Sequence, residues 1–182
     1  MRSIPDPGFA DDDGGVDPVV ATALAAYDRA GEADERSAHL DALAVLQDSR
    51  VLVPVVAVLD EVEYDAPPGG GAGSGLPREK SSDMAAVLMT GRDGRTALLA
   101  FTGTTSLDRW AQTYDGGEAR PVPVPARQAA RAALQDQAVA LLVDVGGPVL
   151  FVIEGEDLRS LAAGHRLLRL DGRWAWVQPS SS

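Results

Sequence analysis

Several residue types and patterns are scarce in this chain, and each shortage excludes a class of function. Cysteine is absent from the 182 residues, which rules out disulfides, thiol nucleophiles and zinc–thiolate sites. The two histidines, His39 and His165, do not lie at metal-ligand spacing, and no HExxH motif is present. No apolar run approaches the roughly 20 residues that a membrane-spanning helix needs, and the N-terminus lacks an apolar signal-peptide core. We therefore expect a cytoplasmic protein with no membrane partner, no metal and no cofactor.

Positive charge is also scarce. The chain has 16 Lys and Arg against 27 Asp and Glu, a net charge of −11, and the first 50 residues are the most acidic part. Because nucleic acid is bound through cations that displace its counterions, this balance argues against a DNA or RNA partner. An acidic surface keeps a protein soluble and also suits a basic protein partner.

The composition predicts one domain with a short tail. Residues 1–16 are rich in Pro, Gly and Asp and have little to bury, so we expect a disordered N-terminal tail. Residues 17–178 are long enough for a single domain with a sizeable core. Within it, residues 66–82 are rich in Gly, Pro and Ser and predict a flexible loop.

Two helices are predicted at the start of the domain. Asp17 is a plausible N-cap with Pro18 in the first turn, and Asp34 could cap the second helix. Further along, helices are predicted near Ser106, in PARQAARAALQDQ and in EGEDLRSLAAG.

Strands are predicted between these helices. The run Val51–Leu59 reads as a buried strand, with Pro54 placing it at an edge or a bulge. Asp93-Gly94 and Asp171-Gly172 each predict a hairpin, and RPVPV reads as an edge strand. Together the elements indicate an α+β fold, a mixed β-sheet packed by helices and preceded by two N-terminal helices.

The loop GGGAGSGLPREKSS invites comparison with a phosphate-binding loop but does not match one. The residue before Lys80 is Glu79 rather than glycine, and its carboxylate would repel a phosphate. The dinucleotide-binding pattern fails because Leu76 stands where a glycine is required. A nucleotide site is therefore not expected here.

FTGTTSLDRWAQ is the most distinctive stretch. We expect one of its hydroxyl residues to cap the following helix and Trp110 to face the sheet. Trp174 and Trp176 share one face of the last strand by the period of two, and they either close the core, which we favour, or form a docking patch. Asp60 and Glu61 after the first strand are the only local support for a carboxylate-dependent hydrolase.

Several motifs occur in an order that points to a family. VLVPVV, KSSDMAAVLMTGRDGRTALLAFTGTTSLDRW, RPVPVPARQAARAAL, ALLVDVGGPVLFVI and LRSLAAG span about residues 34–165. In this order they resemble the SseB-like family, specifically the actinobacterial proteins with an SseB N-terminal domain. The resemblance implies a single α/β domain with no established enzymatic activity and no cofactor, and it carries over no catalytic residues. Longer relatives have a second C-terminal domain, which we do not expect here.

Two functions remain open at this level. The first is a non-enzymatic protein–protein interaction or regulatory module with an unidentified protein partner. The alternative is the binding of a small anionic ligand near Lys80, Arg120 and the 101–106 loop, where cations in an acidic protein would suit a carboxylate or phosphate. The candidate surface residues are Lys80, Ser81, Ser82, Thr102, Arg120, Trp174 and Trp176.

Overall fold

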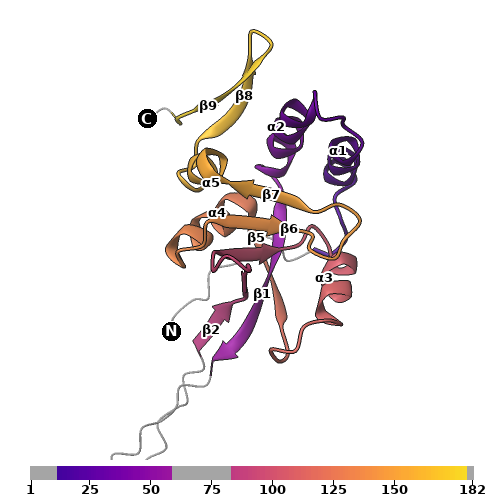
Figure 1. Ribbon diagram of the computed structural model, residues 1–182, viewed down its shortest axis with the longest axis vertical. Coiled ribbons are helices and arrows are strands. Elements are labelled where there is room, and N and C mark those ends of the chain that lie inside the picture. Colours follow the sequence, from indigo (N-terminus) through magenta and orange to yellow (C-terminus); the bar gives the residue numbers. More distant parts are fainter. Residues whose placement is uncertain (1–11, 59–82, 180–182) are drawn as a thin grey trace, which may run out of the picture.

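The computed structural model of the chain describes residues 12–58 and 83–179. Within these ranges the helices are α1 (Pro18–Asp28), α2 (Glu35–Leu46), α3 (Thr104–Ala111), α4 (Ala126–Gln135) and α5 (Gly155–Ala162). The strands are β1 (Arg50–Val58), β2 (Asp83–Ala86), β3 (Leu88–Thr90), β4 (Thr96–Ala100), β5 (Arg120–Pro125), β6 (Ala140–Val143), β7 (Phe151–Glu154), β8 (Arg166–Leu170) and β9 (Arg173–Val177). The α+β class and the two leading helices are thus as predicted (Figure 1).

The strands form three sheets rather than one. A three-stranded sheet has the order β2-β1-β5, a four-stranded sheet the order β3-β4-β6-β7, and β8 pairs only with β9. The four-stranded sheet is mixed, because β4 and β6 are parallel while its other pairs are antiparallel. A single bridge between Leu52 and Phe101 connects β1 to the end of β4.

The four-stranded sheet is covered on both faces. Alternate residues such as Leu98, Leu141 and Ile153 join a core that includes buried side chains of α1, α2, α4 and α5. Leu99 and Phe101 face the other way and pack with Leu107 and Trp110 of α3 and residues around them. Trp110 therefore faces the sheet as predicted. Its ring centroid lies 5.4 Å from that of Phe101.

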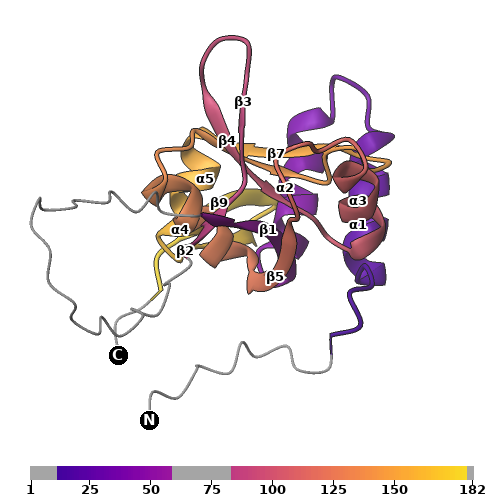
Figure 2. The ribbon, with the colours of Figure 1, turned by 90° about the horizontal axis from the view of Figure 1, so that it is seen from below.

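Local turn chemistry produces the expected hairpins. β3 and β4 pair in antiparallel register across the turn that contains Asp93-Gly94, and their tip extends away from the other strands (Figure 2). Asp171 and Gly172 both have positive φ, at 47° and 79°, which is the type I′ geometry that suits a two-residue turn. The last hairpin, β8–β9, projects from the rest of the chain (Figure 1).

The prolines of β5 lie where their missing N–H groups do not disturb the pairing with β1. In β5, Pro121 and Pro123 pair with Pro54 and Leu52 of β1, at positions whose backbone polar groups point away from the partner strand. Their missing N–H groups therefore face outward, and no ladder bond is lost. This confirms the predicted edge strand.

Of the two positions predicted for Pro54, an edge or a bulge, the edge is wrong. It lies in β1, the central strand of its sheet, and not at an edge. Its carbonyl accepts a hydrogen bond from Val87 N, so the missing N–H of Pro54 would also point to this side of β1. On this side the segment that pairs with β1 changes from Phe101 to β2. A missing donor is tolerated there because the ladder is interrupted. Val87 also divides the predicted strand Met84–Met89 into β2 and β3.

None of the helices described is long and apolar enough to cross a membrane.

Candidate functional site

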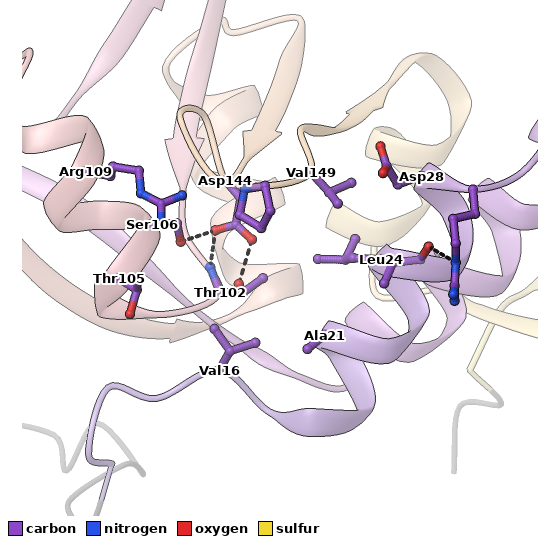
Figure 3. A pocket seen from close by; sticks show the side chains of 13 residues that line it. Val16, Ala21, Leu24, Asp28, Thr102, Thr105, Ser106, Arg109, Asp144 and Val149 are labelled. Atoms are coloured by element: carbon purple, nitrogen blue, oxygen red, sulfur yellow. Dashed lines mark hydrogen bonds between the residues drawn. The ribbon is translucent and has the colours of Figure 1, made fainter.

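A cavity of about 580 Å³ lies between α1, α3 and the ends of β4 and β6. Figure 3 shows α1 contributing one wall and α3 with the strand ends contributing the other. Because β4 and β6 are parallel, their carboxyl ends meet here, which is where ligands bind in open α/β sheets. The cavity is lined by Val16, Ala21, Leu24, Ala25, Asp28, Arg29, Thr102, Thr105, Ser106, Arg109, Asp144, Pro148 and Val149.

A buried carboxylate lies at the centre of this region. Asp144 is 4% exposed and follows β6 directly. Its Oδ1 accepts hydrogen bonds from Thr102 N at 2.8 Å and Ser106 Oγ at 2.6 Å, and its Oδ2 accepts one from Thr102 Oγ1 at 2.6 Å. Three neutral donors thus compensate for the desolvation of one charge.

The backbone around Asp144 is shaped to bring these groups together. Asp144 has φ of 60°, in the left-handed region that Asp tolerates better than most residues. A Cβ at Gly147 would lie 3.0 Å from Asp144 Cβ and 3.3 Å from Ser106 Cβ, so only glycine fits this close approach without displacing its neighbours. The VDVGGP sequence therefore holds β6 and α3 in contact.

Val16 lines the cavity, and residues 12–15 before it are bound to the domain by hydrogen bonds. The Arg50 guanidinium donates to Asp12, to Gly15 O and to Thr102 O, and Gly14 O accepts from Thr104 N. The hydrogen bond from Arg50 holds the pKa of the Asp12 carboxyl below its ordinary value. The predicted tail, 1–16, therefore ends earlier than expected, since its last five residues bind to the domain. Residues 1–11 lie outside the described residues.

The α3 side of the cavity presents free polar groups. Arg109 and Thr105 are exposed and lie one helical turn apart. Figure 3 shows the Arg109 side chain on the same side of the cavity as Ser106 and Asp144, with Asp28 at the opposite end. Within residues 12–58 and 83–179, Arg109 forms no ion pair.

A second buried carboxylate, Asp157 of α5, has a different environment. It is 5% exposed and accepts hydrogen bonds from Arg36 at 2.6 and 3.3 Å and from Trp176 Nε1 at 3.0 Å. Burial alone would raise its pKa, but the hydrogen bonds from Arg36 and Trp176 outweigh burial and lower it. His39 lies nearby, stacked on Phe151, and donates from Nε2 to Val152 O at 2.9 Å. His39 is thus engaged in packing.

The predicted site residues that the structure describes do not gather in one place. Thr102 is buried in the Asp144 network, whereas Arg120 is exposed at the start of β5. Arg120 pairs with Val55, five residues along β1 from the Arg50 that contacts Thr102, a separation of about 17 Å for extended chain. Arg120 does not line the cavity. Lys80, Ser81, Ser82 and the loop 66–82 lie outside the described residues, as do Asp60 and Glu61.

Trp174 and Trp176 support the core interpretation of the last hairpin. Both are half-buried and pack against the main core, and Trp174 Nε1 donates to Asp41 at 3.2 Å. Gln47 of α2 holds the same hairpin from its other strand, because its side chain amide exchanges two hydrogen bonds with the backbone of Leu167, at 2.9 and 3.0 Å. The indoles therefore anchor the hairpin to the domain.

One predicted helix cap is confirmed, one is confirmed in position only, and one is wrong. Asp17 accepts from Val19 N at 2.7 Å as expected. Gly103, and no hydroxyl residue, is the N-cap of α3, because the hydroxyls of Thr102 and Ser106 are bonded to Asp144 instead. Asp34 is the N-cap of α2 but makes no side-chain cap bond.

The central site residues, Asp144, Ser106 and Arg109, were not among the predicted ones. The available signal was an aspartate directly after a buried strand, followed by two glycines. Among the residues that the structure describes, no three His, Cys, Asp or Glu side chains are grouped so that they could hold a metal ion.

Comparisons with known proteins agree with this architecture. The family model described as "SseB protein N-terminal domain" matches residues 20–160, which include the helices except for the start of α1 and the end of α5, and the strands up to β7. Neither the curated proteins nor the solved structures contain a significant match. With more than three quarters of its length matched by this model, the chain belongs to the SseB N-terminal domain family.

Proposed function

We propose that this SseB domain is a non-enzymatic interaction module that binds an extended, acidic segment of a protein partner along the β8–β9 hairpin. The observation that carries the proposal is that this hairpin is a separate two-stranded ladder, anchored on one face and unpaired at the edge of β9. Isolated two-stranded hairpins are marginally stable, so an added strand would also stabilise this one.

The free edge of β9 is suited to strand addition. Leu167 directs its backbone polar groups away from β9, toward Gln47. Trp176 is paired with Leu167 and Trp174 with Arg169, so the backbone groups of both indole residues point outward on the opposite edge. Across the described part of the chain, the N–H groups of Trp174 and Trp176 have no hydrogen-bond partner. An extended peptide could pair with them.

The outer face of the hairpin combines exposed leucines with two arginines, Arg166 and Arg173. Leu168 is 37% exposed and Leu170 51% exposed, on the face opposite the two indoles. Ala175 pairs with Leu168 and contributes to the same face. The free edge is that of β9, so an added strand would lie beside Ala175, and its long apolar side chains would reach toward Leu168 and Leu170 on the next strand.

The charge of this region favours an acidic partner segment. Between residues 158 and 179 the chain has four arginines and a single aspartate, although its net charge as a whole is −11. Complementary charge steers a partner to one patch and disfavours others. The same net charge disfavours nucleic acid as a partner, and the proposal places the domain in the cytoplasm.

The cavity groups support binding over catalysis. Asp144 already accepts three hydrogen bonds, and Thr102 and Ser106 direct their hydroxyl protons to it. A general base or nucleophile must reach a substrate proton or carbon, and these groups are committed to each other.

Photo-cross-linking tests the proposed surface. A p-benzoylphenylalanine residue replaces Leu170 in the tagged full-length chain, which is irradiated in its native cell, and the cross-linked peptide is identified by mass spectrometry. The matched control carries the same residue at Val19, an exposed apolar position of α1. We expect one partner peptide, acidic and extended, at position 170 and not at position 19.

Charge reversal provides the second arm. Arg173→Glu should reduce the cross-link yield several-fold, and Arg92→Glu, on the β3–β4 turn, should leave it unchanged. Equal yields at 170 and 19, a cross-linked peptide without acidic residues, or a cross-link to a second copy of the chain would each overturn the proposal.

A further inference from the structure

We infer that the cavity between α1 and α3 is a binding site for a small organic monocarboxylate with an apolar body. Its carboxylate would lie at Arg109 and Thr105, and its apolar part along α1 and the 148–149 segment. The site is separate from the hairpin and from any protein partner bound there. It also differs from the anion site that the sequence indicated, because Arg120 does not line it.

The size and lining of the cavity suit such a ligand. Its volume of about 580 Å³ is within the range of small-molecule sites, about 300–1,000 Å³. Such sites combine a mainly apolar wall with a few convergent polar groups. Here the apolar wall consists of Val16, Ala21, Leu24, Ala25, Pro148 and Val149.

The polar end selects an anion. Arg109 is a guanidinium without a carboxylate partner among the described residues, and Thr105 supplies a hydroxyl one turn earlier on the same helix face. A planar guanidinium matches the two oxygens of a carboxylate. A phosphate, with three terminal oxygens and more charge, would need additional donors that this end of the cavity lacks.

The acidic residues of the cavity do not oppose this orientation. Asp144 is surrounded by its three donors. Asp28 lies at the end of the cavity away from Arg109, and Arg29 is its neighbour in sequence (Figure 3). The α3 end of the cavity therefore carries the exposed cation Arg109, whereas at the α1 end the charges of Asp28 and Arg29 offset each other.

The site is held open before any ligand arrives. Gly147 allows the close approach of Asp144 and Ser106, and Arg50 donates both to Thr102 O and to Gly15 O, next to Val16 of the cavity wall. A cavity whose walls are fixed by hydrogen bonds loses little conformational entropy on binding.

Titration by NMR tests the inference, with octanoate as the probe and octanamide as its uncharged analogue. In ¹⁵N-HSQC spectra of the full chain, we expect octanoate to shift the amides of Thr105, Ser106, Arg109 and Val149 in a saturable way. Octanamide should bind at least 5-fold more weakly, and acetate, which lacks the apolar body, should not saturate.

Two variants locate the ligand. Arg109→Gln should weaken octanoate about 10-fold and leave octanamide unchanged, whereas Arg92→Gln removes the same charge elsewhere and should change neither. Ala25→Phe fills the cavity and should abolish both, and Ala26→Phe, exposed on the same helix but outside the cavity, should abolish neither.

Several results would overturn the site. Shifts spread over the surface, equal losses in the Arg109 and Arg92 variants, or full binding by Ala25→Phe would each exclude it. Octyl phosphate binding more tightly than octanoate would exclude the carboxylate assignment. Because Arg109 is exposed, its variant keeps the HSQC spectrum of a folded protein, and the charge test stands even if Ala25→Phe fails to fold.

Discussion

Two aspartates are buried to nearly the same extent in this domain but are stabilised in opposite ways. Asp144 receives only neutral donors, a backbone N–H and two hydroxyls, from segments beside the cavity. Asp157 is bound by the charged Arg36 and by the Trp176 indole, where α2, α5 and the hairpin meet. The comparison separates two ways of compensating a buried charge: by neutral donors alone, or by a cation together with an indole N–H.

The aspartate compensated by neutral donors alone should contribute more to stability. Asp144→Ala leaves three donors without an acceptor and puts Ala at a left-handed φ, so we expect a loss of about 3–5 kcal/mol in the free energy of unfolding by urea denaturation. Asp144→Asn keeps the shape and an acceptor oxygen, and we expect it to lose about 1–2 kcal/mol. Equal losses in the two variants would show that the network matters less than the backbone conformation.

Removing the cation should have a smaller, pH-dependent effect. The Arg36 side chain is 66% exposed, so we expect Arg36→Gln to cost about 1–2 kcal/mol at neutral pH. The pKa of Asp157 is lowered in the folded protein, so its contribution is present above the ordinary value of 3.8 and is lost as pH falls through the folded pKa. The stability difference between wild type and variant should therefore shrink on acidification. Parallel stability curves down to about pH 3 would contradict the assignment.

The indole donor to Asp157 can be removed while an aromatic ring is kept at position 176. Trp176→Phe should cost about 1 kcal/mol, because one hydrogen bond to a buried carboxylate is lost. Trp174→Phe is the matched control, since its partner Asp41 is exposed, and its effect should be about half as large or less. Thermal melts of the two variants distinguish them, and a larger loss at Trp174 would refute the distinction.

A surface carboxylate, Asp48, should show the smallest loss of stability in this comparison. Asp48 bonds Arg127 at 2.8 Å and Arg166 at 2.7 Å, but its side chain is 45% exposed. We expect Asp48→Asn to cost about 0.5 kcal/mol or less, and the loss to vanish at high salt. A salt-independent loss as large as that of Arg36→Gln would show that this pair acts as a buried one.

Features written in short stretches of sequence were predictable. The two Asp-Gly turns, the Asp17 cap and the proline-spaced edge strand each depend on residues within a few positions of one another. Their physical cause is local, so their pattern is visible before folding.

The candidate site was not predictable by the same means. Asp144 meets Thr102 and Ser106 across separations of 42 and 38 residues, and only the parallel pairing of β4 and β6 brings them together. Because of the same pairing, the hydroxyls of Thr102 and Ser106 bind Asp144 and do not form the helix cap that was expected of them. The edge position predicted for Pro54 is wrong for a related reason, because the whole sheet determines which strands lie beside a given strand.

The alternating prolines of β5 have a consequence for crowded conditions. Filaments grow across a sheet only if each new strand leaves a further edge of free N–H groups for the next. Pro121 and Pro123 remove those donors from the outer side of β5, so growth across this sheet has to stop at that strand. Copies of this domain that meet through the three-stranded sheet could join at the β2 side once, as a pair, and could not continue into a fibre.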